Sequence, residues 1–170
     1  MSEQQPTTGR PRYSMTGLDD EHLVAMGEVA YWAARAERTL ALVVTAFISI
    51  ESEVGVVVTN GMPFARLLEL GFQLAGLRPD DDQARDIYSR LAGPLKKAMD
   101  SRNHLLHSEW TKPKQGPASA TLTRGKGKVE REFSVEAIRD VADELLLYAD
   151  RLFILFLVIE GHVDYTELAP

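Results

Sequence analysis

The sequence predicts an all-α fold: an up-and-down bundle of four to five helices with a small β-hairpin insertion before the last helix. Apolar residues recur at three- and four-residue spacing over most of the chain, as in amphipathic helices. Short connections rich in Gly, Pro, Asn and Asp separate these stretches, so neighbouring helices are expected to pack antiparallel. One later stretch alternates with a period of two around glycines, which is typical of a hairpin.

The first predicted helix runs from Leu18 to about Val58. Three consecutive acidic residues at its start complement the positive end of the helix dipole, and Thr59-Asn60-Gly61 supplies the turn that ends it. A second, short helix covers residues 64–75 and stops at Gly76, a residue that commonly ends helices.

The third predicted helix begins at the acidic run 80–82 and continues towards Leu106, with Pro94 expected to kink or divide it. The hairpin follows, with strands on either side of the turn at 124–127. Ser134 begins the last helix, which continues to about residue 160.

Composition limits the possible classes of protein. Residues 1–17 are expected to form a disordered tail, and residues 18–165 a single helical domain. The absence of cysteine excludes disulfides and thiolate metal sites, and no cofactor or metal motif is present. The most apolar run, residues 152–159, is shorter than the roughly 20 residues of a membrane span, so no membrane partner is expected and a cytoplasmic location is the default.

Charge is distributed unevenly along the chain. The formal net charge is −6, but nine Lys or Arg residues against three acidic residues between positions 96 and 131 give a local balance of +6. Such a basic segment can bind a nucleic-acid backbone, although a solvated hairpin explains it equally well. The candidate RNA-binding residues there are Lys112, Lys114, Arg124, Lys126 and Lys128.

The residues that indicate chemistry are Arg102, Asn103 and His107, near the end of the third predicted helix. Cleavage of RNA without a metal requires a proton acceptor, a proton donor and positive charge on the phosphoryl oxygens. Histidine exchanges protons near neutrality, and the forked guanidinium of arginine matches phosphate oxygens bidentately. On an ideal helix Arg102 and His107 lie about 140° apart, so their convergence requires a distorted terminus or a second subunit.

This Arg-Asn-x3-His pattern resembles the catalytic motif of the HEPN superfamily. The resemblance implies a helical homodimer that cleaves RNA to a 2′,3′-cyclic phosphate, with Arg102, Asn103 and His107 as catalytic residues. It also implies a place in toxin–antitoxin, antiviral or stress systems, with an antitoxin or regulatory protein as partner. In one toxin subfamily a tyrosine follows the histidine by two residues, but Glu109 stands there in this chain, which argues against that subfamily's partnership.

Two further residues are candidates for a supporting role. Glu37 places a carboxylate on an otherwise apolar face of the first predicted helix, and we expect it to meet Arg102 or a motif histidine across the bundle. His104 is either a second proton carrier or a surface neighbour of Asp100.

The same residues fit two other interpretations. Arg102 can pair structurally with Asp100 or Glu37, and His107 can cap a helix C-terminus. A function of a different class is a noncatalytic HEPN-like binding or dimerisation module, such as a scaffold or an immunity partner. An assay of RNA cleavage distinguishes the two functions.

Overall fold

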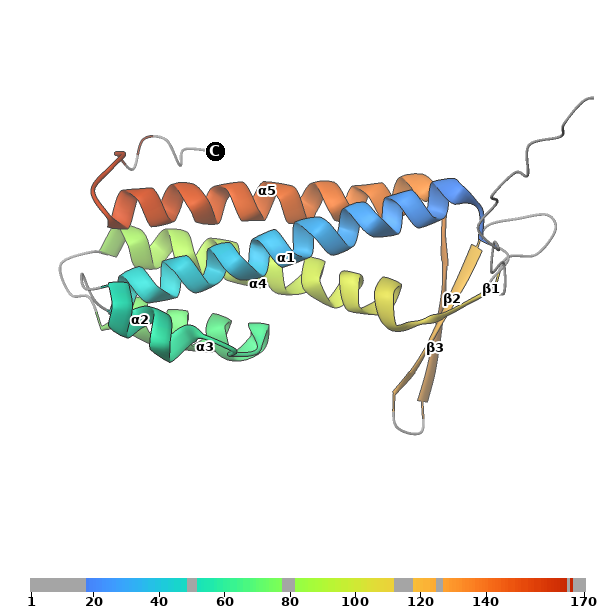
Figure 1. Cartoon of the computed structure of the whole chain (residues 1–170), viewed down its shortest axis with the longest axis horizontal. Helices are drawn as coiled ribbons and strands as arrows, with labels where there is room; N and C mark the ends of the chain where they lie inside the picture. Colours follow the sequence, from blue (N-terminus) through green and yellow to red (C-terminus); the bar gives the residue numbers. More distant parts are fainter. Residues whose placement is uncertain are drawn as a thin grey trace, which may run out of the picture.

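The computed structural model describes residues 18–48, 52–77, 82–111, 118–124, 127–164 and 166. These residues form five α-helices and one three-stranded antiparallel sheet (Figure 1). The all-α class, with a small β insertion before the last helix, is therefore confirmed. The expected tail over residues 1–17 lies outside the described residues.

Three long helices form the body of the molecule: α1 (Asp20–Ile48), α4 (Asp82–His107) and α5 (Val135–Ile159). The largest contact between helices is that of α1 with α5, and α4 packs mainly on α5. Figure 1 shows that α1 and α5 run in the same direction, away from the sheet, and that α4 runs towards it. The end of α4 and the starts of α1 and α5 therefore lie at the sheet end of the bundle.

The parallel course of α1 and α5 is visible in their ion pairs. Glu28 of α1 lies 3.9 Å from Arg139 of α5, and Arg35 of α1 lies 3.0 Å from Asp150. Both partners advance along the chain from one pair to the next, as they must when two adjacent helices point the same way. These pairs are exposed and add little to stability.

The expected single helix from Leu18 to Val58 is wrong. The helix stops at Ile48, and a separate helix, α2 (Ser52–Thr59), folds back on α1, while residues 49–51 lie outside the described part. Gly55 of α2 packs directly against Thr45, and the hydroxyls of Thr45 and Thr59 are 3.2 Å apart. In a continuous helix, residues 45 and 55 would be about 15 Å apart along the axis, so this contact requires a reversal.

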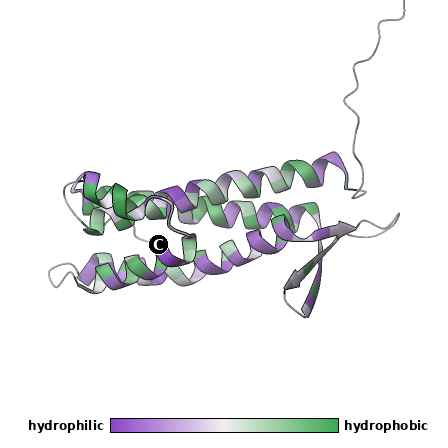
Figure 2. Cartoon of the chain, turned by 60° about the horizontal axis from the view of Figure 1, so that its bottom comes forward, coloured by the Kyte–Doolittle hydropathy of each residue, from purple (hydrophilic) through white to green (hydrophobic). Residues whose placement is uncertain are grey.

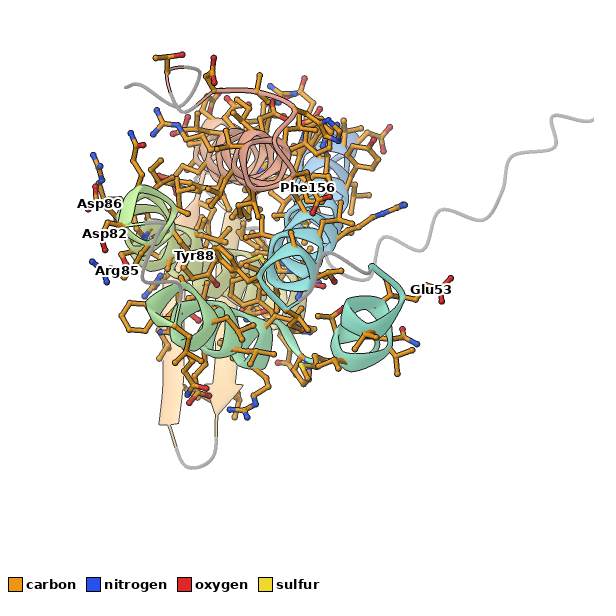
Figure 3. The ribbon with its side chains drawn as sticks, turned by 90° about the vertical axis from the view of Figure 1, so that its left-hand side faces the viewer. Glu53, Asp82, Arg85, Asp86, Tyr88 and Phe156 are labelled. Carbon is orange, nitrogen blue, oxygen red and sulfur yellow. The ribbon has the colours of Figure 1, made fainter. Side chains whose placement is uncertain are left out.

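The predicted second and third helices are present. Helix α3 (Phe64–Gly76) packs on α4 through Tyr88, whose hydroxyl donates to the carbonyl of Leu68 at 3.0 Å. Figure 3 shows Tyr88 reaching from α4 into the space beside α3, whereas Asp82, Arg85 and Asp86 point outwards from α4. Helix α4 continues through Pro94, so that residue does not divide it.

The sheet contains β1 (Glu109–Thr111), β2 (Ala118–Arg124) and β3 (Gly127–Phe133) in the order β1-β2-β3. Strands β2 and β3 form the predicted hairpin, which projects from one end of the bundle (Figure 1). Strand β1 is an addition that the sequence did not predict. It begins two residues after α4 ends and holds Trp110 against the sheet and the helix.

One continuous apolar core joins the helices and the inner face of the sheet. Figure 2 shows hydrophobic and hydrophilic residues interspersed along the helices, as expected when each buries one face. Buried residues of α1, α4 and α5 supply most of the core, and Trp110, Ala118 and Ala120 extend it onto the sheet. Within the described ranges, the structure contains no helix with the length and apolar character of a membrane span.

The start of α5 leads to a prediction about acid stability. Ser134 accepts a hydrogen bond from the backbone N–H of Ala137, as predicted for an N-cap. The pKa of Glu136 is lowered, first by a bond to its own backbone N–H and then by the Ser134 hydroxyl. A carboxyl whose folded pKa is lowered contributes stability above its unfolded pKa and loses it as pH falls through the folded value. We expect the Glu136→Gln variant to lose less stability than the wild type as the pH falls.

Melting temperatures of the wild type and Glu136→Gln at neutral pH and below pH 4.5, the ordinary value for this carboxyl, test this expectation. The wild type should melt higher at neutral pH, and the difference should shrink in acid. Glu144→Gln, in the middle of the same helix, is the matched control. A difference that does not change with pH would contradict the assignment.

Candidate functional site

Arg102 interrupts the apolar stripe by which α4 contacts the bundle. Buried residues follow one another along this helix in alternating steps of four and three, the spacing of a helix that packs along one face. Arg102 occupies the next position of the same stripe and is only partly exposed. Its guanidinium therefore belongs to a row whose other members are buried Ala84, Tyr88, Leu91, Leu95, Ala98 and Leu105.

The guanidinium of Arg102 is incompletely paired. Its Nη1 donates to Oδ1 of the adjacent Asn103 at 2.9 Å. Its Nε is buried and has no hydrogen-bond partner, and it is the only such side-chain nitrogen or oxygen among the described residues. An unpaired buried donor costs about 1–3 kcal/mol, and native proteins retain few of them. The structure thus brings Arg102 and Asn103 together and leaves one donor of the pair without an acceptor.

His107 is the last residue of α4, and its side chain is exposed. Helix α4 remains α-helical up to this residue, so no distorted terminus turns His107 towards Arg102. No hydrogen bond joins the two side chains in the described structure. A single chain therefore presents the arginine and the histidine on different sides of the helix, about 140° apart.

His104 is buried, so its interpretation as a surface neighbour of Asp100 is wrong. Its Nε2 lies 3.3 Å from the carbonyl oxygen of Ala120 in β2, and its ring centroid lies 5.8 Å from that of Phe133 in β3. Asp100 instead pairs with Lys96 at 3.4 Å. The contacts of His104 with two strands fix the sheet on the end of α4.

Glu37 is half-buried on α1, as its apolar surroundings in the sequence suggested. The expected contact across the bundle is not formed: within the described residues, no hydrogen bond or ion pair links its carboxylate to Arg102 or to either motif histidine. Asp100 is not bonded to Arg102 either, since its carboxylate faces Lys96. Neither Glu37 nor Asp100 therefore accepts a hydrogen bond from the Nε of Arg102.

The predicted RNA-binding residues are only partly within the described structure. Lys112, Lys114, Lys126 and the side chain of Arg124 lie outside it. Lys128 is exposed on β3 and pairs in register with Thr123.

Alternation along the strands places Lys128 on the same face of the sheet as Glu109, Glu130 and Glu132. Three carboxylates against one ammonium make this face negative. The face therefore gives little support to RNA binding by Lys128.

Arg131 is a basic residue outside the predicted RNA-binding set. It is exposed on the opposite face of β3 from Lys128, in register with Ala120, whose carbonyl contacts His104. This face of the sheet also carries buried Trp110 and Ala118, so its inner part packs on the bundle. The alternation in the sequence predicts that Arg131 and Lys128 lie on opposite faces of the strand. The position of Arg131 near α4 follows only from the strand register, which pairs it with Ala120.

Comparisons with protein-family models, curated proteins and solved structures found no match for this chain. Within the described residues, no group of three or more His, Cys, Asp or Glu side chains is arranged to hold a metal ion. The candidate site consists of the partly buried Arg102–Asn103 pair and the exposed His107 on α4.

Proposed function

We propose that this protein is a metal-independent endoribonuclease of the HEPN type that acts as a homodimer. The observation that supports this proposal most strongly is the buried, unpaired Nε of Arg102 within an otherwise apolar stripe. A purely structural arginine at this position would be expected to find an acceptor for each buried donor. A phosphate group supplies the missing acceptor and matches the charge and fork geometry of the guanidinium.

Asn103 has a positioning role in this proposal. Its Oδ1 engages Nη1 of Arg102, which leaves Nε and Nη2 for two oxygens of one phosphoryl group. Solvent does not reach Nε in the single chain, so we expect the Arg102 side chain to move when RNA or a second chain binds. Once the guanidinium contacts the phosphoryl group, charge positioned at the transition state commonly contributes on the order of 10²-fold or more to the rate.

His107 carries protons in this proposal. Its exposed ring is accessible to a bound RNA, where it takes the proton of the 2′-OH or gives one to the departing 5′-oxygen. The 2′-oxygen attacks phosphorus as the bond to the 5′-oxygen breaks, which leaves a 2′,3′-cyclic phosphate and a 5′-OH. The first copy's own His107 does not face its Arg102. In the proposed dimer, the second copy of α4 brings its His107 to that arginine.

The biological setting follows the same proposal. RNA-cleaving activity of this kind fits a toxin–antitoxin, antiviral or stress role in the cytoplasm, restrained by an antitoxin or regulatory protein. A second candidate function is a noncatalytic HEPN-like scaffold or immunity partner. The observation that favours this second candidate is the separation of Arg102 from His107 in a single chain.

The proposal is tested by incubating a mixed RNA pool with the protein in EDTA. We expect cleavage by the wild type, a loss of about 100-fold or more in His107→Ala, and products that end in a 2′,3′-cyclic phosphate by mass spectrometry. His162→Ala is the matched control because it removes an exposed imidazole beyond α5.

Two outcomes would reject the ribonuclease. Undiminished cleavage by folded His107→Ala would assign the activity to other residues or to a contaminant. Absence of cleavage by a wild-type sample shown to be dimeric would favour the noncatalytic module.

A further inference from the structure

A second candidate site lies on the surface between α1 and α5, apart from the Arg102 motif. The side chains there border an open hollow of about 510 Å³, a size within the range of small-molecule sites. No residue of α4 or of the sheet lines it. The lining residues are Tyr31, Ala34, Arg35, Arg38, Thr39, Leu42 and Phe153.

Two aromatic side chains border the hollow, and each is supported by a second ring. Tyr31 is 62% exposed and meets the edge of Trp32, with ring centroids 4.8 Å apart. Phe153 is 41% exposed and stacks on Phe156 at 6.2 Å. Figure 3 shows Phe156 on the side of α5 that is next to α1. Large exposed rings held in this way suit the binding of a flat apolar ligand.

The two arginines at the hollow differ in their pairing. Arg35 forms an ion pair with Asp150 at 3.0 Å, and its guanidinium lies 5.5 Å from the centre of the Trp32 ring. Arg38, one turn further along α1, forms no ion pair or hydrogen bond with the described residues. The hollow therefore combines two aromatic borders with one uncompensated positive charge.

We propose that this hollow binds a small aromatic anion. The ring of the ligand lies between Tyr31 and Phe153, and its anionic group, a carboxylate or a phosphate, meets the guanidinium of Arg38. The ligand bridges α1 and α5, so it stabilises the largest contact between two helices of the fold. This inference does not depend on the ribonuclease proposal, because none of its residues belongs to the Arg102 motif.

The test is a titration followed by the backbone amide resonances in ¹H–¹⁵N spectra, with two anionic probes and their neutral analogues. AMP and indole-3-acetate carry a phosphate and a carboxylate, and adenosine and indole-3-acetamide lack the charge. We expect the amides of Arg38 and Thr39 to shift with at least one anion. We also expect Arg38→Gln to weaken that binding about tenfold while binding of the neutral analogue is unchanged. Arg66→Gln, an exposed arginine on α3, is the matched control.

Each outcome has a defined meaning. Binding of AMP alone identifies a phosphate ligand, binding of indole-3-acetate alone identifies a carboxylate, and binding of both identifies the shared chemistry. Dissociation constants above about 1 mM for both anions would overturn the proposal. Equal affinity of Arg38→Gln and the wild type would overturn it as well, as would shifts confined to α4.

Discussion

Replacing Arg102 with methionine should remove most of the RNA cleavage and leave the protein as stable as before, or more stable. Methionine fills a similar volume in the apolar stripe of α4 and removes the buried Nε that has no acceptor. Removing an unpaired buried donor should raise the free energy of unfolding by about 1 kcal/mol, whereas losing the guanidinium should reduce cleavage by about 100-fold or more. The two effects thus have opposite signs.

Urea unfolding and cleavage in EDTA, measured on the same preparations, test this pair of effects. Arg90→Met is the matched control: it removes an exposed arginine from the same helix, which among the described residues pairs only with Asp86, and should change neither quantity appreciably. If Arg102→Met instead lowered the free energy of unfolding by about 2 kcal/mol or more, Arg102 would be a structural residue. Its resemblance to a catalytic arginine would then be incidental.

The second large effect is expected at Tyr88, the bulkiest fully buried side chain of the described core. Its ring packs edge-on against Phe47 at 5.7 Å, and its hydroxyl donates to Leu68 of α3. Burial raises the pKa of Tyr88, so the phenol stays uncharged. Tyr88→Ala should lower the free energy of unfolding by about 3–5 kcal/mol, and Tyr88→Phe by about 1 kcal/mol.

Gly71 provides a sharper test of the same contact. A Cβ added at Gly71 would collide with the Tyr88 hydroxyl and lie 2.6 Å from the ring carbon that bears it. Gly71→Ala alone should therefore destabilise the protein by about 1–3 kcal/mol. In the Tyr88→Ala background the same substitution should be stabilising, because the space is empty and alanine favours the helix by about 1 kcal/mol.

A double-mutant cycle in urea measures this reversal of sign, with Gly93→Ala as the control because a Cβ there meets no neighbour within 4 Å. If Gly71→Ala had the same sign in both backgrounds, α3 and α4 would not pack as described.

Local signals in the sequence predicted several element boundaries correctly. Helix α3 ends at Gly76, one residue past the predicted end, and Ser134 caps α5 by accepting from the backbone N–H of Ala137 in the first turn of that helix. The reversal between α1 and α2 has no local signal in the sequence, because apolar periodicity continues on both sides of it. The contact of Gly55 with Thr45 that marks the reversal is tertiary. Strand β1 is not predictable from the sequence, because three residues are too few to show alternation.

The candidate site was predictable to the extent that it is local. Arg102 and Asn103 are adjacent in the sequence and are bonded in the structure. The burial of His104 was not predictable, because its partner Ala120 belongs to a strand sixteen residues away. The position of Arg102 within a buried row could have been found by following the alternating steps of four and three back from Leu105. The lack of an acceptor for its Nε depends on residues from other elements, so only the three-dimensional structure reveals it.

The parallel pairing of α1 with α5 also has a consequence for the order of folding. Its two ion pairs join residues 111 and 115 positions apart in the chain, and this pair of helices makes the largest contact in the molecule. During synthesis α1 emerges first and must wait for nearly the whole domain before its main partner is available. Closing so long a loop slows folding, and the part of the apolar face of α1 that packs on α5 stays exposed in the meantime. Truncation before α5 should therefore give an aggregating chain instead of a smaller folded bundle.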